Sequence, residues 1–178
     1  ADAAAAAKGL AKDSVEIKYW YSDVFAPNDD IKTKMSGWYT EGTQVVFSCG
    51  GGIYLSAVAA AEAADGKVIG VDVDQSGESD LIITSAMKGL TESVKLSLTS
   101  FYAAGKKWDA SYAGKTATLG AKDKGVGLPT AASSWRLEKF TVAEYEALFA
   151  KLADGTIVVS NATDKPPVTT VVKVDYQS

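Results

Sequence analysis

The sequence contains no histidine and only one cysteine among its 178 residues. Histidine is the usual general base and zinc ligand at neutral pH, and Ser-His and Cys-His dyads depend on it. Its absence argues against most hydrolases. A lone cysteine cannot form an internal disulfide, so we expect Cys49, at the end of an apolar run, to be a small buried apolar residue rather than a reactive thiol.

Basic charge and long apolar runs are scarce as well. The formal net charge is −4, so the chain lacks the basic surface that nucleic-acid binding requires. The longest apolar-rich segment, residues 53–64, includes Ser56 and Glu62 and is shorter than a transmembrane helix. The remaining composition, with 47% apolar and 22% charged residues, is that of a globular chain long enough for one sizeable core.

Residues 44–75 have the pattern of a strand, a glycine turn, a helix and a second strand. Residues 45–47 and 67–71 are short, apolar and rich in β-branched side chains, which predicts strands buried on both faces. The alanine-rich stretch between them predicts the helix. In an open α/β sheet, ligands bind beyond the carboxyl ends of such strands. We therefore expect the functional site at the ends of these two strands.

Two features lie at those strand ends. Gly50, Gly51 and Gly52 follow the first strand, and without a Cβ they let the backbone turn tightly and let a ligand approach its N–H groups. Asp72 and Asp74 follow the second strand. Residues two apart in a strand point to the same face only while the strand stays regular, and at this strand end we expect the two carboxylates to diverge rather than form a catalytic pair.

The rest of the chain also alternates between helix and strand. Helices are predicted for residues 1–12, 30–41, 88–104 and 140–153, and further strands for residues 15–21, 81–85, 117–119, 125–128, 156–160 and 168–176. Thr141 and Glu144 are three residues apart at the start of the last helix, which predicts a capping box. Asn28 or Asp29 is expected to cap the second helix.

Phe25 and Lys88 both lie beside the expected crevice. Phe25 is in a turn-rich loop just past a predicted strand, where core packing and stacking on a flat ligand remain equally open. Lys88 opens the helix predicted for residues 88–104, where the helix dipole disfavours a cation. A solvated surface lysine and a lysine with a compensating partner are both consistent with this position. The same helix has an apolar stripe that must pack on another surface. The stripe comprises Leu90, Val94, Leu98 and Phe101 or Tyr102.

The glycine turn and the acidic strand end match no phosphate or metal motif. A Walker A loop requires Lys and Ser/Thr where this chain has Ile53 and Tyr54, and the dinucleotide-binding glycine pattern is also missing. Residues 72–79 lack the spacing and the closing glutamate of an EF-hand. We expect neither a metal nor a cofactor.

A series of four segments resembles the basic membrane protein family of substrate-binding lipoproteins, of the purine nucleoside receptor A type. The segments are GTQVVFSCGGG, VIGVDVDQ, LIITSAMK and LGAKDKGVGL, in this order. The resemblance implies a type I periplasmic-binding-protein fold, in which two doubly wound α/β lobes with parallel sheets close on a purine nucleoside. It also implies delivery to an ABC transporter permease, no enzymatic activity, and a place at the bacterial cell surface or in the periplasm through a lipid-anchored cysteine outside this chain.

The resemblance further implies that the chain is the C-terminal half of such a protein. Its opening stretch is similar to the middle of a helix, so we expect a fragment or a processed product whose N-terminal lobe lies outside it. Residues 1–135 are then the second-lobe domain, and residues 136–178 the C-terminal helix with a crossover or edge strand. The helix at residues 88–104 is expected to pack on the first lobe.

Five residues match family positions that bind the ligand. Phe25 in SDVFAP is similar to the aromatic residue that stacks on the purine, and Gly51 and Gly52 to the glycine pair beside the ribose. Asp72 resembles the acid that grips the ribose hydroxyls, and Lys88 the lysine beside it. A ribose diol offers two donors to one carboxylate, which suits this arrangement.

The chain departs from the family at Ile53 and Tyr54, where Thr-Gly is common, so a bulky side chain is expected to re-line the sugar end. Two other classes of function stay open. One is a sensor or binding module of the same fold for a sugar or another small signal. The other is a nucleoside phosphorylase or hydrolase, which would need a base or metal cluster that the sequence does not offer.

Overall fold

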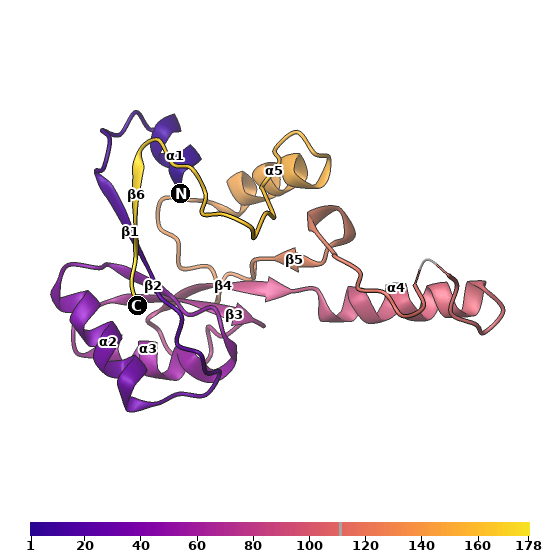
Figure 1. Cartoon of the computed structure of the whole chain (residues 1–178), viewed down its shortest axis with the longest axis horizontal. Helices are drawn as coiled ribbons and strands as arrows, with labels where there is room; N and C mark the ends of the chain where they lie inside the picture. Colours follow the sequence, from indigo (N-terminus) through magenta and orange to yellow (C-terminus); the bar gives the residue numbers. More distant parts are fainter. Residues whose placement is uncertain (111) are drawn as a thin grey trace. The chain divides into compact units, whose positions relative to one another are not determined.

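Two β-sheets organise the chain in the computed structural model, which describes residues 1–110 and 112–178. The helices and strands in chain order are α1 (Asp2–Ala7), β1 (Val15–Tyr19), α2 (Asp29–Thr40), β2 (Val45–Phe47), η1 (Gly51–Ile53), α3 (Tyr54–Glu62), β3 (Lys67–Asp72), β4 (Ile82–Lys88), α4 (Leu90–Ala103), η2 (Ala121–Asp123), β5 (Val126–Gly127), α5 (Val142–Ala153) and β6 (Val172–Tyr176) (Figure 1). The chain divides into two compact units, unit 1 from residues 1–23 and 160–178 and unit 2 from residues 24–159.

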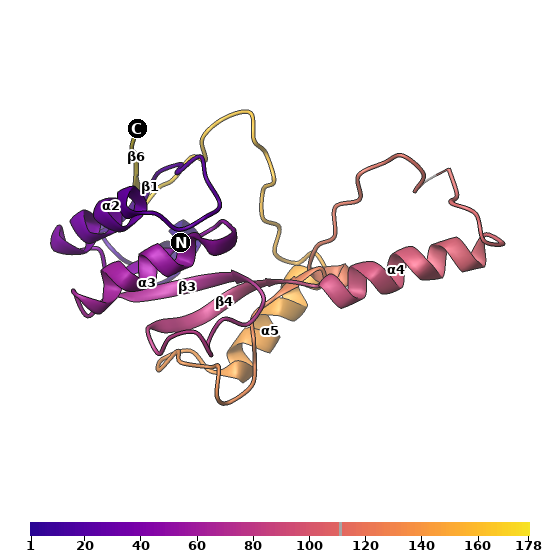
Figure 2. The ribbon, with the colours of Figure 1, turned by 90° about the horizontal axis from the view of Figure 1, so that it is seen from below.

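The sheet of unit 2 has the strand order β2-β3-β4-β5. Strands β2, β3 and β4 are parallel, and β5 is antiparallel to β4. Helices α2 and α3 cover one side of this sheet and α5 lies on the other (Figure 2). Helix α3 forms the crossover between β2 and β3, as a parallel connection requires. Strands β3 and β4 are joined instead by a non-helical loop, residues 73–81.

The core of unit 2 depends on small side chains. Ala57, Ala60 and Ala61 of α3 are 0–1% exposed, so the helix approaches the sheet closely. Below it, Val68 of β3 and Ile82 of β4 are fully buried. Burying such apolar surface stabilises the fold by about 25 cal/mol per Å². The alanine-rich composition noted in the sequence is therefore explained by close helix–sheet packing.

Unit 1 is made from the two ends of the chain. Strands β1 and β6 pair in parallel, with Val15 opposite Val172 (Figure 1). The Asp2 carboxylate accepts hydrogen bonds from the backbone N–H groups of Thr170, Val171 and Val172 at 2.8–3.1 Å. These bonds, from Val172 first and then Val171, hold the pKa of Asp2 well below its usual range. Consecutive N–H groups form an anion-binding concavity, filled here by the chain's own carboxylate.

Several predicted elements are confirmed. The capping box is present, since Thr141 accepts from the Glu144 N–H at 3.2 Å and the Glu144 carboxylate accepts from the Thr141 N–H at 2.8 Å. Asn28 is the cap of α2, and its side chain accepts from the Ile31 N–H at 2.8 Å. The tail forms β6 within the predicted range, and it is an edge strand.

Other predicted elements are wrong. Within the described residues neither 117–119 nor 156–160 forms a strand. Val158 and Val159 are β-branched but 84% and 73% exposed, so no neighbouring strand covers them. Strand β2 is not buried on both faces, because it is the edge of its sheet, and Val45 and Phe47 are 41% and 51% exposed.

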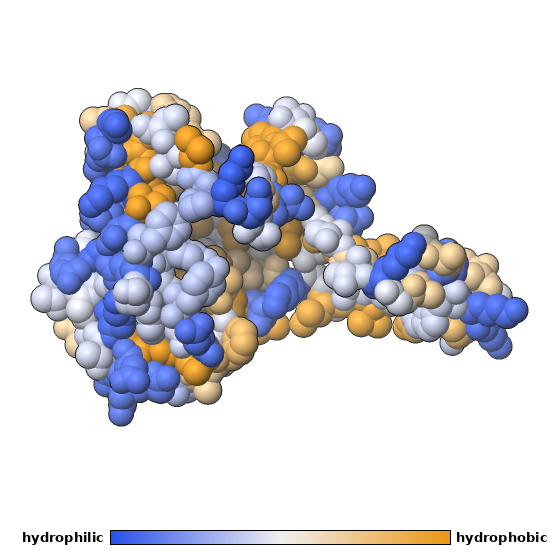
Figure 3. All heavy atoms as spheres, in the orientation of Figure 1, coloured by the Kyte–Doolittle hydropathy of each residue, from blue (hydrophilic) through white to orange (hydrophobic). Residues whose placement is uncertain are grey.

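Helix α4 carries the predicted apolar stripe on an open surface. It buries none of its residues within the described chain, and its exposed apolar side chains are Leu90, Val94, Leu96, Leu98 and Tyr102. Figure 3 shows hydrophobic residues on the surface of this helix. None of the helices in the described ranges combines the length and the hydrophobicity needed to cross a bilayer.

Candidate functional site

The glycine turn after β2 lies against the loop that carries Phe25. The Gly52 N–H donates to the Phe25 carbonyl oxygen at 2.7 Å. A Cβ on Gly51 would lie 3.0 Å from the same oxygen, and Gly51 has a φ of +44°, so both close approach and backbone conformation favour glycine there. Because the Gly52 N–H is already bonded, the glycine pair positions Phe25 rather than offering both N–H groups to a ligand.

Phe25 itself presents its ring to solvent. Its side chain is 76% exposed, which excludes the core-packing interpretation within unit 2. Two of its ring carbons lie 3.4 and 3.7 Å from the position of a Cβ on Gly50, and the Ile53 methyl lies 3.2 Å from it. An aromatic ring held on a tight turn with its face open suits stacking on a flat ligand.

Asp72 and Lys88 form an ion pair at the ends of β3 and β4. The Lys88 Nζ lies 2.6 Å from the Asp72 Oδ1, and the two side chains are 65% and 39% exposed. The hydrogen bond with Asp72, followed by the charge of that carboxylate, raises the pKa of Lys88. The two residues that the resemblance assigns to the ribose are therefore in direct contact.

The sequence predicts that Lys88 opens a helix, and this prediction is wrong. Lys88 is the last residue of β4. Helix α4 begins two residues later, after Gly89. A Cβ on Gly89 would lie 2.0 Å from the Lys124 carbonyl oxygen, so the close approach of that segment requires glycine here. The strand continues to Lys88, which brings its side chain beside the end of β3.

The turn and the ion pair share one edge of the sheet. Strands β2, β3 and β4 are parallel neighbours, so their carboxyl ends lie side by side. Cys49 lies in the turn after β2, at this edge of the sheet. Cys49 is exposed, and the prediction of a buried apolar residue is wrong because the chain has already left the edge strand.

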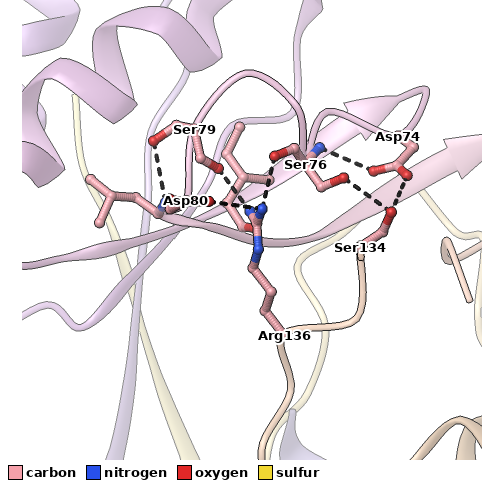
Figure 4. Close-up of polar contacts among 8 residues, drawn as sticks. Asp74, Ser76, Ser79, Asp80, Ser134 and Arg136 are labelled. Carbon is pink, nitrogen blue, oxygen red and sulfur yellow. Dashed lines mark hydrogen bonds and ion pairs between the residues drawn. The ribbon is translucent and has the colours of Figure 1, made fainter. Parts of the chain in front are cut away.

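Asp74 has different surroundings (Figure 4). Its carboxylate accepts from the Ser134 hydroxyl at 2.6 Å and from the Ser76 N–H at 3.0 Å. The two carboxylates, Asp72 and Asp74, therefore have different partners. Across the described residues no group of three His, Cys, Asp or Glu side chains is arranged to hold a metal ion.

Arg136 forms hydrogen bonds with the loop between β3 and β4. Its guanidinium donates to the carbonyl oxygens of Ser79, Ile82 and Ser76 at 2.8–3.0 Å and to the Asp80 carboxylate at 3.0 Å (Figure 4). The loop has no helix to satisfy these carbonyls, and Arg136 supplies the donors. Sequence reasoning missed this residue, because its partners lie 54–60 positions away and no local pattern marks them.

The two bulky departures from the family pattern occupy different places. The Ile53 methyl lies near Gly50 and so beside the Phe25 ring. The Tyr54 hydroxyl is hydrogen-bonded to Glu78, and its pKa is raised by burial first and then by that carboxylate. Ile53 is therefore the residue of the two that borders the candidate site.

The candidate site is an open surface. Two hollows of about 420 and 290 Å³ lie elsewhere in unit 2, one between η2 and the end of α5 and the other between the start of α2 and α3, and their linings include none of the five predicted residues. The site combines an exposed aromatic ring, a glycine turn and an exposed ion pair at the strand ends. In open α/β sheets, ligands bind at this edge, beyond the carboxyl ends of the strands.

The family model of PnrA-like ABC transporter substrate-binding proteins, Bmp, matches residues 8–159, and the chain belongs to this family. The structure is similar to the "Crystal structure of ABC transporter system solute-binding proteins from Aeropyrum pernix K1", with a TM-score of 0.57 and 18% sequence identity over 92% of this chain. The chain spans 61% of the length of that protein. A search of curated proteins gives no match.

These similarities confirm the family and the fold class. The mixed α/β arrangement with parallel strands corresponds to part of a periplasmic-binding-protein fold. Solute-binding proteins carry a ligand without transforming it, so the family is not one of enzymes. Substrate-binding proteins of ABC transporters act outside the cytoplasm, which supports a periplasmic or surface location.

Proposed function

We propose that the protein is the substrate-binding component of an ABC transporter that takes up a purine nucleoside. The observation that carries this proposal is the Asp72–Lys88 ion pair at the same sheet edge as the exposed Phe25 ring. A nucleoside presents a flat base at one end and a diol at the other. Phe25 stacks on the base, and the Asp72 carboxylate, paired with Lys88, accepts hydrogen bonds from both ribose hydroxyls.

The base-stacking half of the proposal predicts a specific loss. Stacking of a base on an aromatic side chain contributes about 1–3 kcal/mol. Phe25→Ala in the full-length protein should weaken nucleoside binding by that amount, with little change in the thermal melting temperature because the side chain is 76% exposed. Unchanged affinity would remove Phe25 from the binding site.

The ribose half of the proposal is tested by removing the hydroxyls. Hydrogen bonds to a charged group contribute roughly 1.5–3 kcal/mol each, and each 1.4 kcal/mol is about tenfold in affinity. Adenosine, guanosine and inosine should therefore bind at least about 100-fold more tightly than their 2′,3′-dideoxy forms in calorimetric titrations. Asp72→Ala should abolish most of this discrimination, whereas Asp74→Ala should leave it nearly intact.

Alkylation of Cys49 gives an independent readout. Cys49 is the single cysteine of the chain, it is exposed, and it lies in the turn after β2, at the sheet edge where β3 and β4 also end. A bound nucleoside should slow its reaction with iodoacetamide, and the dideoxy form should not at the same concentration. Equal affinities for ribose and dideoxy forms, or tight binding of free hexoses, would overturn the nucleoside assignment and favour a sugar-binding sensor.

The proposal includes a second lobe and a membrane anchor. We propose that the N-terminal lobe covers the open site and the exposed apolar side of α4, with residues 1–135 in the second lobe and residues 136–178 as the C-terminal helix and crossover. A lipid anchor outside this chain and a permease partner complete the transporter. The 178-residue chain alone should then bind nucleosides only weakly, because half of the cleft is missing. Micromolar binding by this chain alone would contradict the two-lobed arrangement.

A further inference from the structure

Asp72 has a backbone conformation that needs support. Its φ is +67°, and the Val73 N–H donates to the Val71 carbonyl oxygen at 2.7 Å. This bond closes a γ-turn around Asp72, in the rare and strained form with a positive central φ. A residue other than glycine stays in such a conformation only where the surrounding structure holds it there.

Gln75 bonds directly to that turn. Its side-chain Oε1 accepts from the Val71 N–H at 2.9 Å, the residue just before Asp72. Its own backbone N–H donates to the Ser85 hydroxyl at 3.1 Å. Gln75 is 9% exposed and Ser85 is fully buried. The end of β3 is thus tied to β4 through a buried glutamine rather than through the sheet alone.

Gly70 provides the space for this arrangement. A Cβ at that position would lie 2.5 Å from the Gln75 Oε1 and 2.8 Å from the Ser85 hydroxyl oxygen. Both distances are too short for any side chain, so Gly70 allows the amide to reach the Val71 N–H. Gly70, Gln75 and Ser85 together form what we term the glutamine lock.

We propose that Gln75 is a positioning residue, which holds the Asp72 γ-turn so that the Asp72 carboxylate meets Lys88 at the ligand-binding edge. Without the Gln75 acceptor, the Val71 N–H loses its partner and the strained turn relaxes toward an extended backbone, which directs the carboxylate away from Lys88. The part of this inference that concerns ligand affinity rests on the proposed function. The part that concerns the ion pair does not.

The ion pair gives a ligand-independent test. The pKa of Lys88, raised by Asp72, is measured by NMR on the 178-residue chain with labelled lysine. Gln75→Met keeps the length and burial of the side chain but removes the acceptor, and it should lower the pKa of Lys88 toward its ordinary value. Ser134→Ala removes a hydrogen bond from the same loop on the Asp74 side and should leave that pKa unchanged. If Gln75→Met does not fold, Ser85→Ala serves in its place with the same expectation. An unchanged Lys88 pKa in the folded variant overturns the proposal.

A double-mutant cycle tests the effect on binding. Gln75→Met in the full-length protein should weaken adenosine binding by about tenfold. The reason is that the strained turn, without its support, would be formed in only about a tenth of the molecules. Asn tolerates a positive φ, so Asp72→Asn removes the charge while keeping the turn, and in that background Gln75→Met should cost nothing more. Additive losses would mean that Gln75 does not act through Asp72. If the wild-type protein binds no nucleoside, the proposed function fails, while the Lys88 pKa still decides the role of the lock.

Discussion

Two carboxylates, two residues apart at the end of β3, have opposite surroundings. Asp74 is held by the Ser134 and Ser76 donors and lies in a network that Arg136 closes. Asp72 is bonded to Lys88 alone among the described residues, and its side chain is 39% exposed. A carboxylate has room for about four hydrogen bonds. The Asp74 carboxylate is therefore occupied by hydrogen bonds within the fold, whereas the Asp72 carboxylate can still accept hydrogen bonds from a ligand.

The comparison shows how a short loop gives two nearby carboxylates different partners. The γ-turn at Asp72 reverses the alternation of the strand, so that the next acidic residue faces the segment containing Ser134 rather than Lys88. The sheet edge then presents one negative charge with one positive partner. Each of the following variants alters either the hydrogen-bond network around Asp74 and Arg136 or the ion pair of Asp72 and Lys88.

The largest effect is expected on the structural side. Arg136→Ala should lower the free energy of unfolding by about 2–4 kcal/mol, because it removes the guanidinium donors of the Ser76 and Ile82 carbonyl oxygens. Urea denaturation followed by circular dichroism measures this loss. Asp80→Ala is the matched control, since that carboxylate is fully exposed and should contribute little. Equal losses from both variants would show that the ion pair, rather than the backbone bonds, stabilises the loop.

A crossed comparison of the two aspartates comes next. Asp72→Asn should weaken nucleoside binding at least about tenfold and leave the urea midpoint nearly unchanged. Asp74→Asn should do the reverse, with a loss of about 1 kcal/mol or less in unfolding free energy and no change in affinity. Titration calorimetry and urea denaturation on the same samples separate the two effects. A loss of affinity in Asp74→Asn would mean that the two sides of the loop are not independent.

The contribution of Asp74 to folding stability should be lost at acidic pH. Burial raises the pKa of Asp74, but the hydrogen bonds from Ser134 and Ser76 and the charge of Arg136 outweigh it, so the pKa lies below its ordinary 3.8. A carboxyl group with a lowered folded pKa stabilises the protein above its unfolded pKa, and this contribution is lost as the pH falls through the folded value. The difference in urea midpoint between the wild type and Asp74→Asn should therefore be constant above about pH 5 and shrink as the pH falls through 3.8 and below. A constant difference would argue against an ionised Asp74.

The smallest effect on stability is expected at Lys88. Its folded pKa is raised above the ordinary 10.5, so its contribution is present below that pH and is lost only at higher, alkaline pH. The pair is exposed and screened by water. Lys88→Met should therefore leave the urea midpoint at neutral pH unchanged within error. A shift as large as that of Arg136→Ala would show that the ion pair is structural.

Much of the fold could be predicted from local patterns. Thr141 and Glu144 mark the start of α5 because a capping box needs only two residues at fixed spacing. The apolar run of β3 and the acid that ends it placed Asp72 at a strand end, where parallel neighbours must also end. The sequence resemblance selected Phe25 and Lys88, and the structure places these residues at the strand ends and beside the glycine turn.

The errors arise where distant residues decide the outcome. The helical pattern that follows Lys88 predicts a helix there, whereas the close approach of Lys124 to Gly89 ends the strand at Lys88. Val158 and Val159 have strand propensity, but β structure requires a neighbour to pair with. Arg136 has no local signature, because it acts through carbonyl oxygens of a loop far away in sequence.

The discontinuity of unit 1 has a consequence for synthesis on the ribosome. Strand β1 is translated before unit 2 and its partner β6 after it. At about 5–20 residues per second, β1 waits on the order of ten seconds with an unpaired edge while unit 2 is completed. Glu16 and Lys18 lie within this strand, and charged side chains on an open edge oppose pairing with other chains. We expect these two charges to protect the nascent protein from aggregation until Lys173 of β6 arrives and pairs with Glu16.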